Sequence, residues 1–202
     1  MKPEARFWQA IRTHLPRKLD RLDRVENSAT SGQPDVNGCL DSEDVWIELK
    51  APKEPARAST PIMTRSGNHP LLESQISWFC RQRQAGGIAF ILIRTNKRIM
   101  LVDGTKFATV FNTWTVGQMA EHSLLVCAVP TPKAEWDFLH HVIITASRHH
   151  RLYRNAQAQQ LLDDMVKGSR LAGDPKPGGS DGALPGRIAA GRSSGRARSP
   201  RR

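Results

Sequence analysis

The sequence predicts an α/β fold, with helices packed on the faces of a β-sheet, and three observations support this prediction. Residues 88–93 form a nearly continuous apolar run, which is typical of a strand buried on both faces. Residues 45–50 alternate apolar and polar side chains, as expected for a strand with one buried face. Residues 4–15 and 71–85 carry apolar side chains at helical spacing. Strands and helices in this order are typical of a sheet covered by helices.

The first helix is expected over residues 4–15. Pro3 suits the first helical position, and Pro16 ends the helix. The apolar stripe of this helix consists of Phe7, Trp8, Ile11 and Leu15. Glu4 lies on the same stripe, so its carboxylate either reaches a cleft at the sheet edge or is an exposed first-turn glutamate favoured by the helix dipole. The pattern leaves both interpretations open.

A β-hairpin is expected to follow and to bring two carboxylates together. Asp35 precedes Asn37-Gly38, a pair typical of a hairpin turn, and the returning strand places Glu48 and Lys50 on its polar face. Two carboxylates beside a lysine are what metal-assisted phosphodiester hydrolysis requires, because carboxylate oxygens bind Mg²⁺ and the lysine orients water or offsets developing charge. The alternative is an exposed hairpin with solvated charges.

Further elements are expected after the hairpin. The helix over residues 71–85 ends at Gly86-Gly87. Its apolar stripe consists of Leu72, Ile76 and Phe79. Gln75 lies on this stripe and is expected to have a buried partner, because an unpaired buried amide costs roughly 1–3 kcal/mol. Another strand is expected at residues 99–102, after a turn at Asn96-Lys97.

Residues 52–70 form a long connection that is rich in proline, arginine, serine and threonine. Its basic side chains include Lys53, Arg57, Arg65 and His69. A connection of this length indicates a function of its own. It is either a loop that contacts substrate over the site or a solvated surface loop.

A helical extension is expected over residues 108–168. Residues 116–129 and 135–165 have helical stretches, with prolines between them as helix breakers. The extension contains the histidine pairs His140-His141 and His149-His150. These pairs lack metal-ligand spacing and are expected to be solvated.

The net charge of +11 and the pI of about 10.3 favour a polyanionic partner, because neutralising phosphates releases counterions. Residues 169–202 contain eight Lys/Arg and two Asp, so they contribute +6 of this charge. They bury too little apolar surface to offset their ordering entropy, which predicts a disordered basic tail that holds DNA non-specifically. The alternative is a tail whose removal changes nothing.

The cysteines are widely spaced and form neither a disulfide framework nor a CxxC zinc pair. A reducing, cytoplasmic location is therefore expected. No apolar run approaches the length of a membrane span, and the first residues do not resemble a signal peptide, so no membrane partner is expected.

Ser-Gly-Gln-Pro-Asp at residues 31–35, followed by Trp-Ile-Glu-Leu-Lys at residues 46–50, resembles the core of the PD-(D/E)xK nucleases. The order and spacing are similar to those of small phage enzymes related to the VRR-NUC and archaeal Holliday-junction-resolvase branches. The resemblance covers roughly residues 1–105. It implies a mixed central sheet flanked by helices, as in restriction endonucleases, and an endonuclease that depends on Mg²⁺ or Mn²⁺. We therefore expect a nuclease core over residues 1–107.

The resemblance also implies site residues outside the hairpin. Residues 24–28, in a weak strand expected at residues 23–28, are similar to phage members, which makes Glu26 a further metal ligand. In resolvase-like relatives this carboxylate comes from the first helix, which makes it Glu4. Gln75 resembles a glutamine that approaches the catalytic site in VRR-NUC-type enzymes. Substrate contacts are expected from Ser31 of the motif at residues 31–35 and, because of the composition of the loop over residues 52–70, from Lys53, Arg57 and Arg65.

These observations predict a metal-dependent endodeoxyribonuclease of phage type, located in the host cytoplasm if a phage encodes it. Asp35, Glu48 and Glu26 bind the metal, and Lys50 supports the attacking water. Branched or junction DNA and a homodimer are expected from the resemblance alone. One alternative is a catalytically silent DNA-binding or virion-associated protein on the same fold. Another is a nuclease for single strands or RNA, although an aromatic content of 6% gives little support for stacking platforms.

Overall fold

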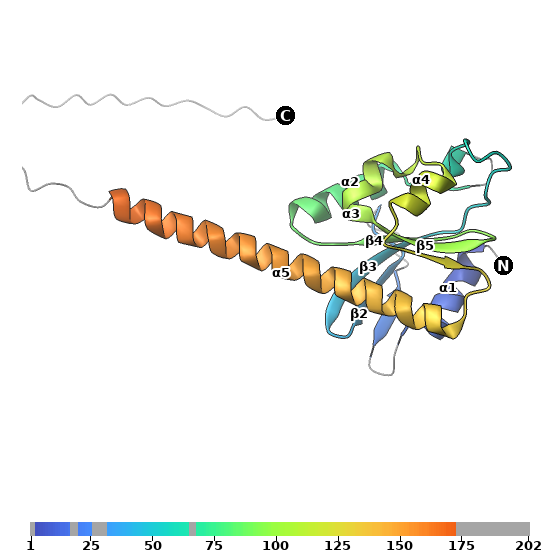
Figure 1. Cartoon of the computed structure of the whole chain (residues 1–202), viewed down its shortest axis with the longest axis horizontal. Coiled ribbons are helices and arrows are strands. Elements are labelled where there is room, and N and C mark those ends of the chain that lie inside the picture. Colours follow the sequence, from blue (N-terminus) through green and yellow to red (C-terminus); the bar gives the residue numbers. More distant parts are fainter. Residues whose placement is uncertain (1–2, 17–19, 26–31, 65–67, 173–202) are drawn as a thin grey trace, which may run out of the picture. The chain divides into compact units, whose positions relative to one another are not determined.

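The computed structural model of the chain describes residues 3–16, 20–25, 32–64 and 68–172 (Figure 1). Within these residues the sheet has six strands, which lie side by side in sequence order. The strands are β1 (Arg21–Arg24), β2 (Val36–Leu40), β3 (Glu43–Lys50), β4 (Phe90–Arg94), β5 (Arg98–Asp103) and β6 (Leu125–Ala128). Neighbouring strands are antiparallel, except that β3 and β4 are parallel. The predicted α/β fold with a mixed sheet is confirmed.

Helices cover both faces of the sheet. They are α1 (Pro3–His14), the 3₁₀ turn η1 (Ile62–Thr64), α2 (Glu73–Gln84), α3 (Gly104–Phe111), α4 (Val116–Glu121) and α5 (Lys133–Ala172). Figure 1 shows α2, α3 and α4 on one face, and α1 with the beginning of α5 on the other. The described elements up to Leu161 belong to one compact unit, and a second unit begins at Leu162. The last four residues of α5 fall in the expected disordered tail, whose remaining residues 173–202 lie outside the described part.

The sheet separates two apolar cores. On the α1 side, Val45, Ile47 and Leu49 of β3 pack among side chains of α1 and α5. Trp46 points to the other face, where α2 and α3 pack, so the predicted alternation along β3 is confirmed. Residues Phe90–Ile93 of β4 are fully buried and contribute to both cores, as the apolar run predicts. The four apolar residues of the predicted stripe of α1 are also buried.

The hairpin turn is not at Asn37-Gly38. Strand β2 continues through both residues, and the chain turns at Asp41 and Ser42, whose φ angles are 48° and 67°. A Cβ on Gly38 would lie 2.1 Å from the carbonyl oxygen of Arg21. Glycine is therefore needed here because β1 approaches closely, and the residue pair that is typical of a turn occurs inside a strand.

Two other predictions require correction near α2 and after α4. Leu72 is 61% exposed, and Leu71 is buried instead, because Leu72 is the extended cap residue before the helix and does not follow its periodicity. Residues 116–129 are not helical throughout. Helix α4 ends at Glu121, and β6 then pairs with β5, since pairing with an available sheet edge outweighs local helical spacing.

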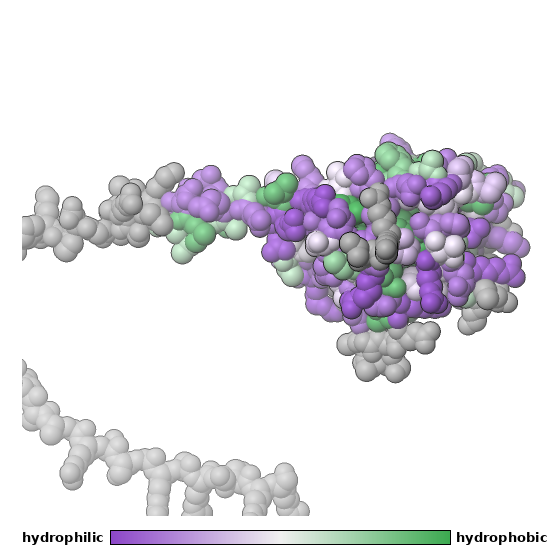
Figure 2. Space-filling view, turned by 90° about the horizontal axis from the view of Figure 1, so that it is seen from below, coloured by the Kyte–Doolittle hydropathy of each residue, from purple (hydrophilic) through white to green (hydrophobic). Residues whose placement is uncertain are grey.

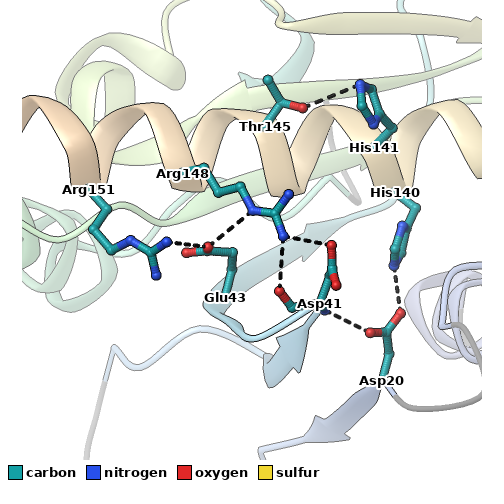
Figure 3. Close-up of polar contacts among 8 residues, drawn as sticks. All are labelled: Asp20, Asp41, Glu43, His140, His141, Thr145, Arg148 and Arg151. Atoms are coloured by element: carbon teal, nitrogen blue, oxygen red, sulfur yellow. Dashed lines mark hydrogen bonds and ion pairs between the residues drawn. The ribbon is translucent and has the colours of Figure 1, made fainter.

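His140 is also not solvated, contrary to the prediction. Its side chain is 1% exposed, and its Nε2 lies 2.6 Å from Oδ2 of Asp20 (Figure 3). It follows the buried Trp136 by one helical turn, so it lies on the face of α5 that packs against the sheet. His141 and His149 are exposed, as predicted.

Two arginines attach α5 to the turn between β2 and β3 (Figure 3). Arg148 Nη2 donates to Asp41 Oδ2 at 2.7 Å, and its Nε donates to Glu43 Oε1 at 3.3 Å. Arg151 Nη2 lies 3.0 Å from the same oxygen of Glu43, whose side chain is only 7% exposed. These contacts fix the end of the hairpin that is remote from Asp35.

None of the helices in the described residues combines the length and the hydrophobicity needed to cross a bilayer. Figure 2 shows mainly hydrophilic side chains on the face that it draws, with apolar residues scattered among them.

Candidate active site

Asp35, Glu48 and Lys50 come together where β2 begins and β3 ends. Asp35 directly precedes β2, and the antiparallel register pairs Val36 with Ile47, which brings the two ends side by side. The Oδ2 of Asp35 accepts a hydrogen bond from the backbone N–H of Leu49 at 3.0 Å. Because this N–H lies between Glu48 and Lys50 in sequence, Asp35 is fixed beside both of them.

Gln75 joins these residues from the first turn of α2. Its Oε1 accepts from the backbone N–H of Leu72 at 3.0 Å, an arrangement that caps the helix and orients the amide. The same oxygen lies 3.4 Å from Lys50 Nζ, and Nε2 donates to Glu48 Oε1 at 2.5 Å. The prediction that Gln75 has a buried partner is confirmed, because its amide contacts both members of the Glu-x-Lys pair.

Glu48 and Lys50 form a buried ion pair. Lys50 Nζ lies 2.9 Å from Glu48 Oε1. The side chain of Lys50 is 7% exposed, and that of Glu48 is 1% exposed. Burial raises the pKa of Glu48 to about 7, although Lys50 lowers it, and the negative charge of Asp35 raises it further. Removal from water therefore outweighs the attraction of the lysine, and a further positive charge at this position would favour the ionised carboxylate.

A cavity of about 220 Å³ contains these side chains. It is lined by Glu4, Asp35, Glu48, Leu49, Lys50, His69, Pro70, Leu72 and Gln75. It is smaller than the roughly 300–1,000 Å³ typical of pockets for organic ligands, so it suits a phosphate group or hydrated ion better than a nucleoside. A larger cavity of about 620 Å³ along α5 is mainly apolar and contains none of the predicted site residues.

The donor set fits a hydrated magnesium ion. Within the described residues no three His, Cys, Asp or Glu side chains are clustered closely enough to hold a metal by themselves. However, Glu48 Oε2 is buried and has no hydrogen-bond partner, and the carboxylate of Asp35 is close enough to raise the pKa of Glu48. Mg²⁺ commonly keeps several waters and uses one or two carboxylates together with substrate phosphate. An unpartnered buried oxygen next to a second carboxylate meets this requirement.

The structure brings together five of the predicted site residues and leaves others elsewhere. Glu4 is half-buried and lines the cavity with Asp35, Glu48, Lys50 and Gln75. The remaining predicted residues do not line it or cannot be placed. Lys53 and Arg57 lie on the following loop outside the cavity lining, and Glu26, Ser31 and Arg65 lie outside the described residues.

His69 was not predicted as a site residue, although it lines the cavity. The sequence placed it only among the basic residues of a long loop. The sequence feature that could have identified it as a site residue is its position directly before Pro70, close to the start of the helix that carries Gln75.

No family model matches the chain, and no curated protein matches it. Among solved structures, the chain resembles Hjc, a Holliday junction resolvase from the archaeal hyperthermophile Archaeoglobus fulgidus. The identity is 15%, the match covers 50% of this chain and 71% of that chain, and the TM-score is 0.34. A likeness of this size indicates neither an activity nor a substrate.

Proposed function

We propose that this protein is a divalent-metal-dependent endonuclease that hydrolyses DNA phosphodiester bonds. One observation carries the proposal: Asp35, Glu48 and Lys50 line a single small cavity in which a buried oxygen of Glu48 has no partner. A buried carboxylate oxygen without a partner is costly in a structural role, whereas it is ready to bind a cation in a catalytic one.

Each side chain of the cavity has a separate role in the proposed hydrolysis. Asp35 and Glu48 would hold Mg²⁺ or Mn²⁺, which would supply Lewis acidity toward the phosphate and the attacking water. Lys50 donates toward Glu48 and Gln75, and because an ammonium has three N–H groups, one is left for the attacking water or a phosphate oxygen. Gln75 holds both side chains in place. Glu4, on the cavity wall, would hydrogen-bond a water molecule in the cavity.

DNA is proposed as the substrate because of charge. The chain carries +11 overall, and a polyanion gains affinity by releasing counterions when cations neutralise its phosphates. Preference for branched or junction DNA, a homodimeric assembly and a phage-type origin are proposed from the resemblance of the hairpin motif. Lys53 and Arg57, on the loop after β3, are proposed to contact the DNA outside the cavity.

The test compares four-way-junction, nicked, linear duplex and single-stranded DNA, each with Mg²⁺ and with EDTA. Asp35→Asn and Glu48→Gln keep the side-chain shapes and remove the charges, and Lys50→Ala removes the ammonium. Asp44→Asn is the matched control, because Asp44 is an exposed carboxylate on the same strand as Glu48. We expect Mg²⁺-dependent cutting by the wild type and the control, a large loss with Lys50→Ala and no cutting by the other two variants.

Two outcomes would contradict the proposal. Equal cutting by the wild type and Glu48→Gln would show that this cavity is not the active site. DNA binding without cutting under every metal condition would favour a catalytically silent DNA-binding or virion-associated protein. The DNA that is cut fastest would identify the substrate class, and preferential cutting of single-stranded DNA would favour a nuclease for single strands.

A further inference from the structure

We propose that His69 is a further catalytic residue, which protonates the leaving oxygen of the cleaved phosphodiester bond. The proposal rests on the nuclease function proposed above. His69 lines the same cavity as Asp35, Glu48 and Lys50, and among the described residues no other histidine does so. It therefore faces the space in which the phosphate would be bound.

The segment that carries His69 is held on both sides by side-chain amides. Before it, Asn68 Oδ1 accepts from the backbone N–H of Lys53 at 2.8 Å, and Asn68 Nδ2 donates to the carbonyl of Lys53 at 3.0 Å. After it, Asn112 Oδ1 accepts from the backbone N–H of Leu71 at 2.8 Å, and Nδ2 donates to the carbonyl of Leu71 at 2.9 Å. Two paired clamps thus fix the residues that flank His69-Pro70.

This arrangement restricts the backbone of His69 without using its ring. Pro70 confines the preceding residue to extended conformations, and Leu71 is buried in the core on the α2 side. Among the described residues no side chain forms a hydrogen bond or ion pair with the His69 ring, which is exposed at the cavity wall. An irregular segment held this firmly, whose central imidazole has no partner among the described side chains, is organised to present that imidazole.

The other groups on the cavity wall are less suited to deliver a proton. Asp35 and Glu48 are assigned to the metal, Glu4 is assigned to a water molecule in the cavity, and Lys50 is held by Glu48 and Gln75. Histidine is the side chain that most readily gives and regains a proton near neutral pH. Exposure to solvent lets the ring of His69 take up a new proton after each reaction.

The oxygen of water forms a bond to phosphorus, and the bond from phosphorus to the leaving oxygen breaks. The leaving oxygen takes a proton from the imidazolium of His69 and becomes a hydroxyl group, while the attacking water loses a proton to solvent. The neutral imidazole then takes a proton from solvent.

The experiment uses the full-length protein with Mg²⁺ and two substrates. The ends of the wild-type products identify which bridging oxygen leaves, and the second substrate carries sulfur at that position. A thiolate is a good leaving group that needs no protonation. Single-turnover rates at saturating protein are measured for the wild type, His69→Gln and His69→Ala, with His149→Gln as a control at an exposed histidine on α5.

We expect both His69 variants to cut the oxygen substrate about 100-fold or more slowly than the wild type, the usual size of a general-acid contribution. On the sulfur substrate all proteins should react at similar rates. Equal losses on both substrates would overturn the role of His69 as an acid, and so would full activity of the variants on the oxygen substrate. A wild type that cuts neither substrate would overturn the nuclease function itself, and with it this role.

Discussion

Replacing Glu48 by glutamine is expected to stabilise the metal-free protein at alkaline pH relative to the wild type. Burial raises the pKa of Glu48 to about 7 from its ordinary value of 4.5, Lys50 opposes this rise, and Asp35 adds to it. The folded protein therefore binds this proton more tightly than the unfolded chain does, and ionisation of Glu48 lowers the free energy of unfolding. Glutamine has the shape of the protonated carboxyl group and cannot ionise.

The size of the effect follows from the two pKa values. A rise from 4.5 to about 7, at about 1.4 kcal/mol for each pKa unit, is worth about 3 kcal/mol. Because the folded-state pKa is the raised one, this stability is fully present below pH 4.5 and is lost as the pH rises through 7. The difference in unfolding free energy between Glu48→Gln and the wild type should therefore grow by about 3 kcal/mol from acidic to alkaline pH.

The assay is urea unfolding in EDTA at a series of pH values on both sides of this range, followed by linear extrapolation. Asp44→Asn, an exposed carboxylate on the same strand, controls for the loss of a charge and should give a constant difference from the wild type. If the difference for Glu48→Gln is also constant with pH, the raised pKa of Glu48 is refuted. Added Mg²⁺ should stabilise the wild type at alkaline pH and should have little effect on Glu48→Gln, because a ligand stabilises only the state that binds it.

Three further predictions concern other parts of the chain. Gly38→Ala should lower the free energy of unfolding by about 2 kcal/mol or more, because β1 must move away from the added methyl group. The control Cys39→Ser, at the exposed neighbouring position, should change this free energy little. Equal urea midpoints for the two variants would contradict the close approach of β1. Burial raises the pKa of Cys127 to about 11, so this thiol should react slowly with alkylating reagents. Iodoacetamide at mildly alkaline pH should modify the exposed Cys39 and leave Cys127 intact until the protein unfolds, as measured by mass spectrometry of peptides. Deleting residues 173–202, the part of the tail that follows α5, should weaken DNA binding and flatten its salt dependence without changing the cleavage rate at saturating DNA. An unchanged salt slope would exclude these residues from binding.

Local periodicity was sufficient for the elements whose burial repeats along the chain. The alternation around Glu48, the apolar run of β4 and the stripe of α1 each report a buried face directly, and all three are confirmed. The convergence of Asp35, Glu48 and Lys50 was predictable for a related reason. They lie at the ends of paired strands, and a hairpin brings its strand ends together whichever residues form its turn.

The features that the sequence did not predict depend on distant partners. Gly38 is needed because β1 approaches it closely, and no local pattern distinguishes such a glycine from one in a turn. Strand β6 forms because β5 offers it an edge to pair with. His69 reaches the cavity because Asn112, far along the chain from Leu71, holds the end of its segment. Each of these depends on a contact that becomes visible only once the sheet is assembled.

The attachment of α5 to the β2–β3 turn has a consequence for the order in which a newly made chain acquires activity. Arg148 and Arg151 bind Asp41 and Glu43 across more than half of the chain's length, and Trp136 and Ile143 complete the core beneath the strands that carry the cavity. A ribosome that has released only the residues up to the end of β5 has therefore produced the acidic and basic groups of the cavity without the helix that completes this core. If the protein cuts DNA, a chain that stops before α5 is therefore expected to cut more slowly than one that contains this helix.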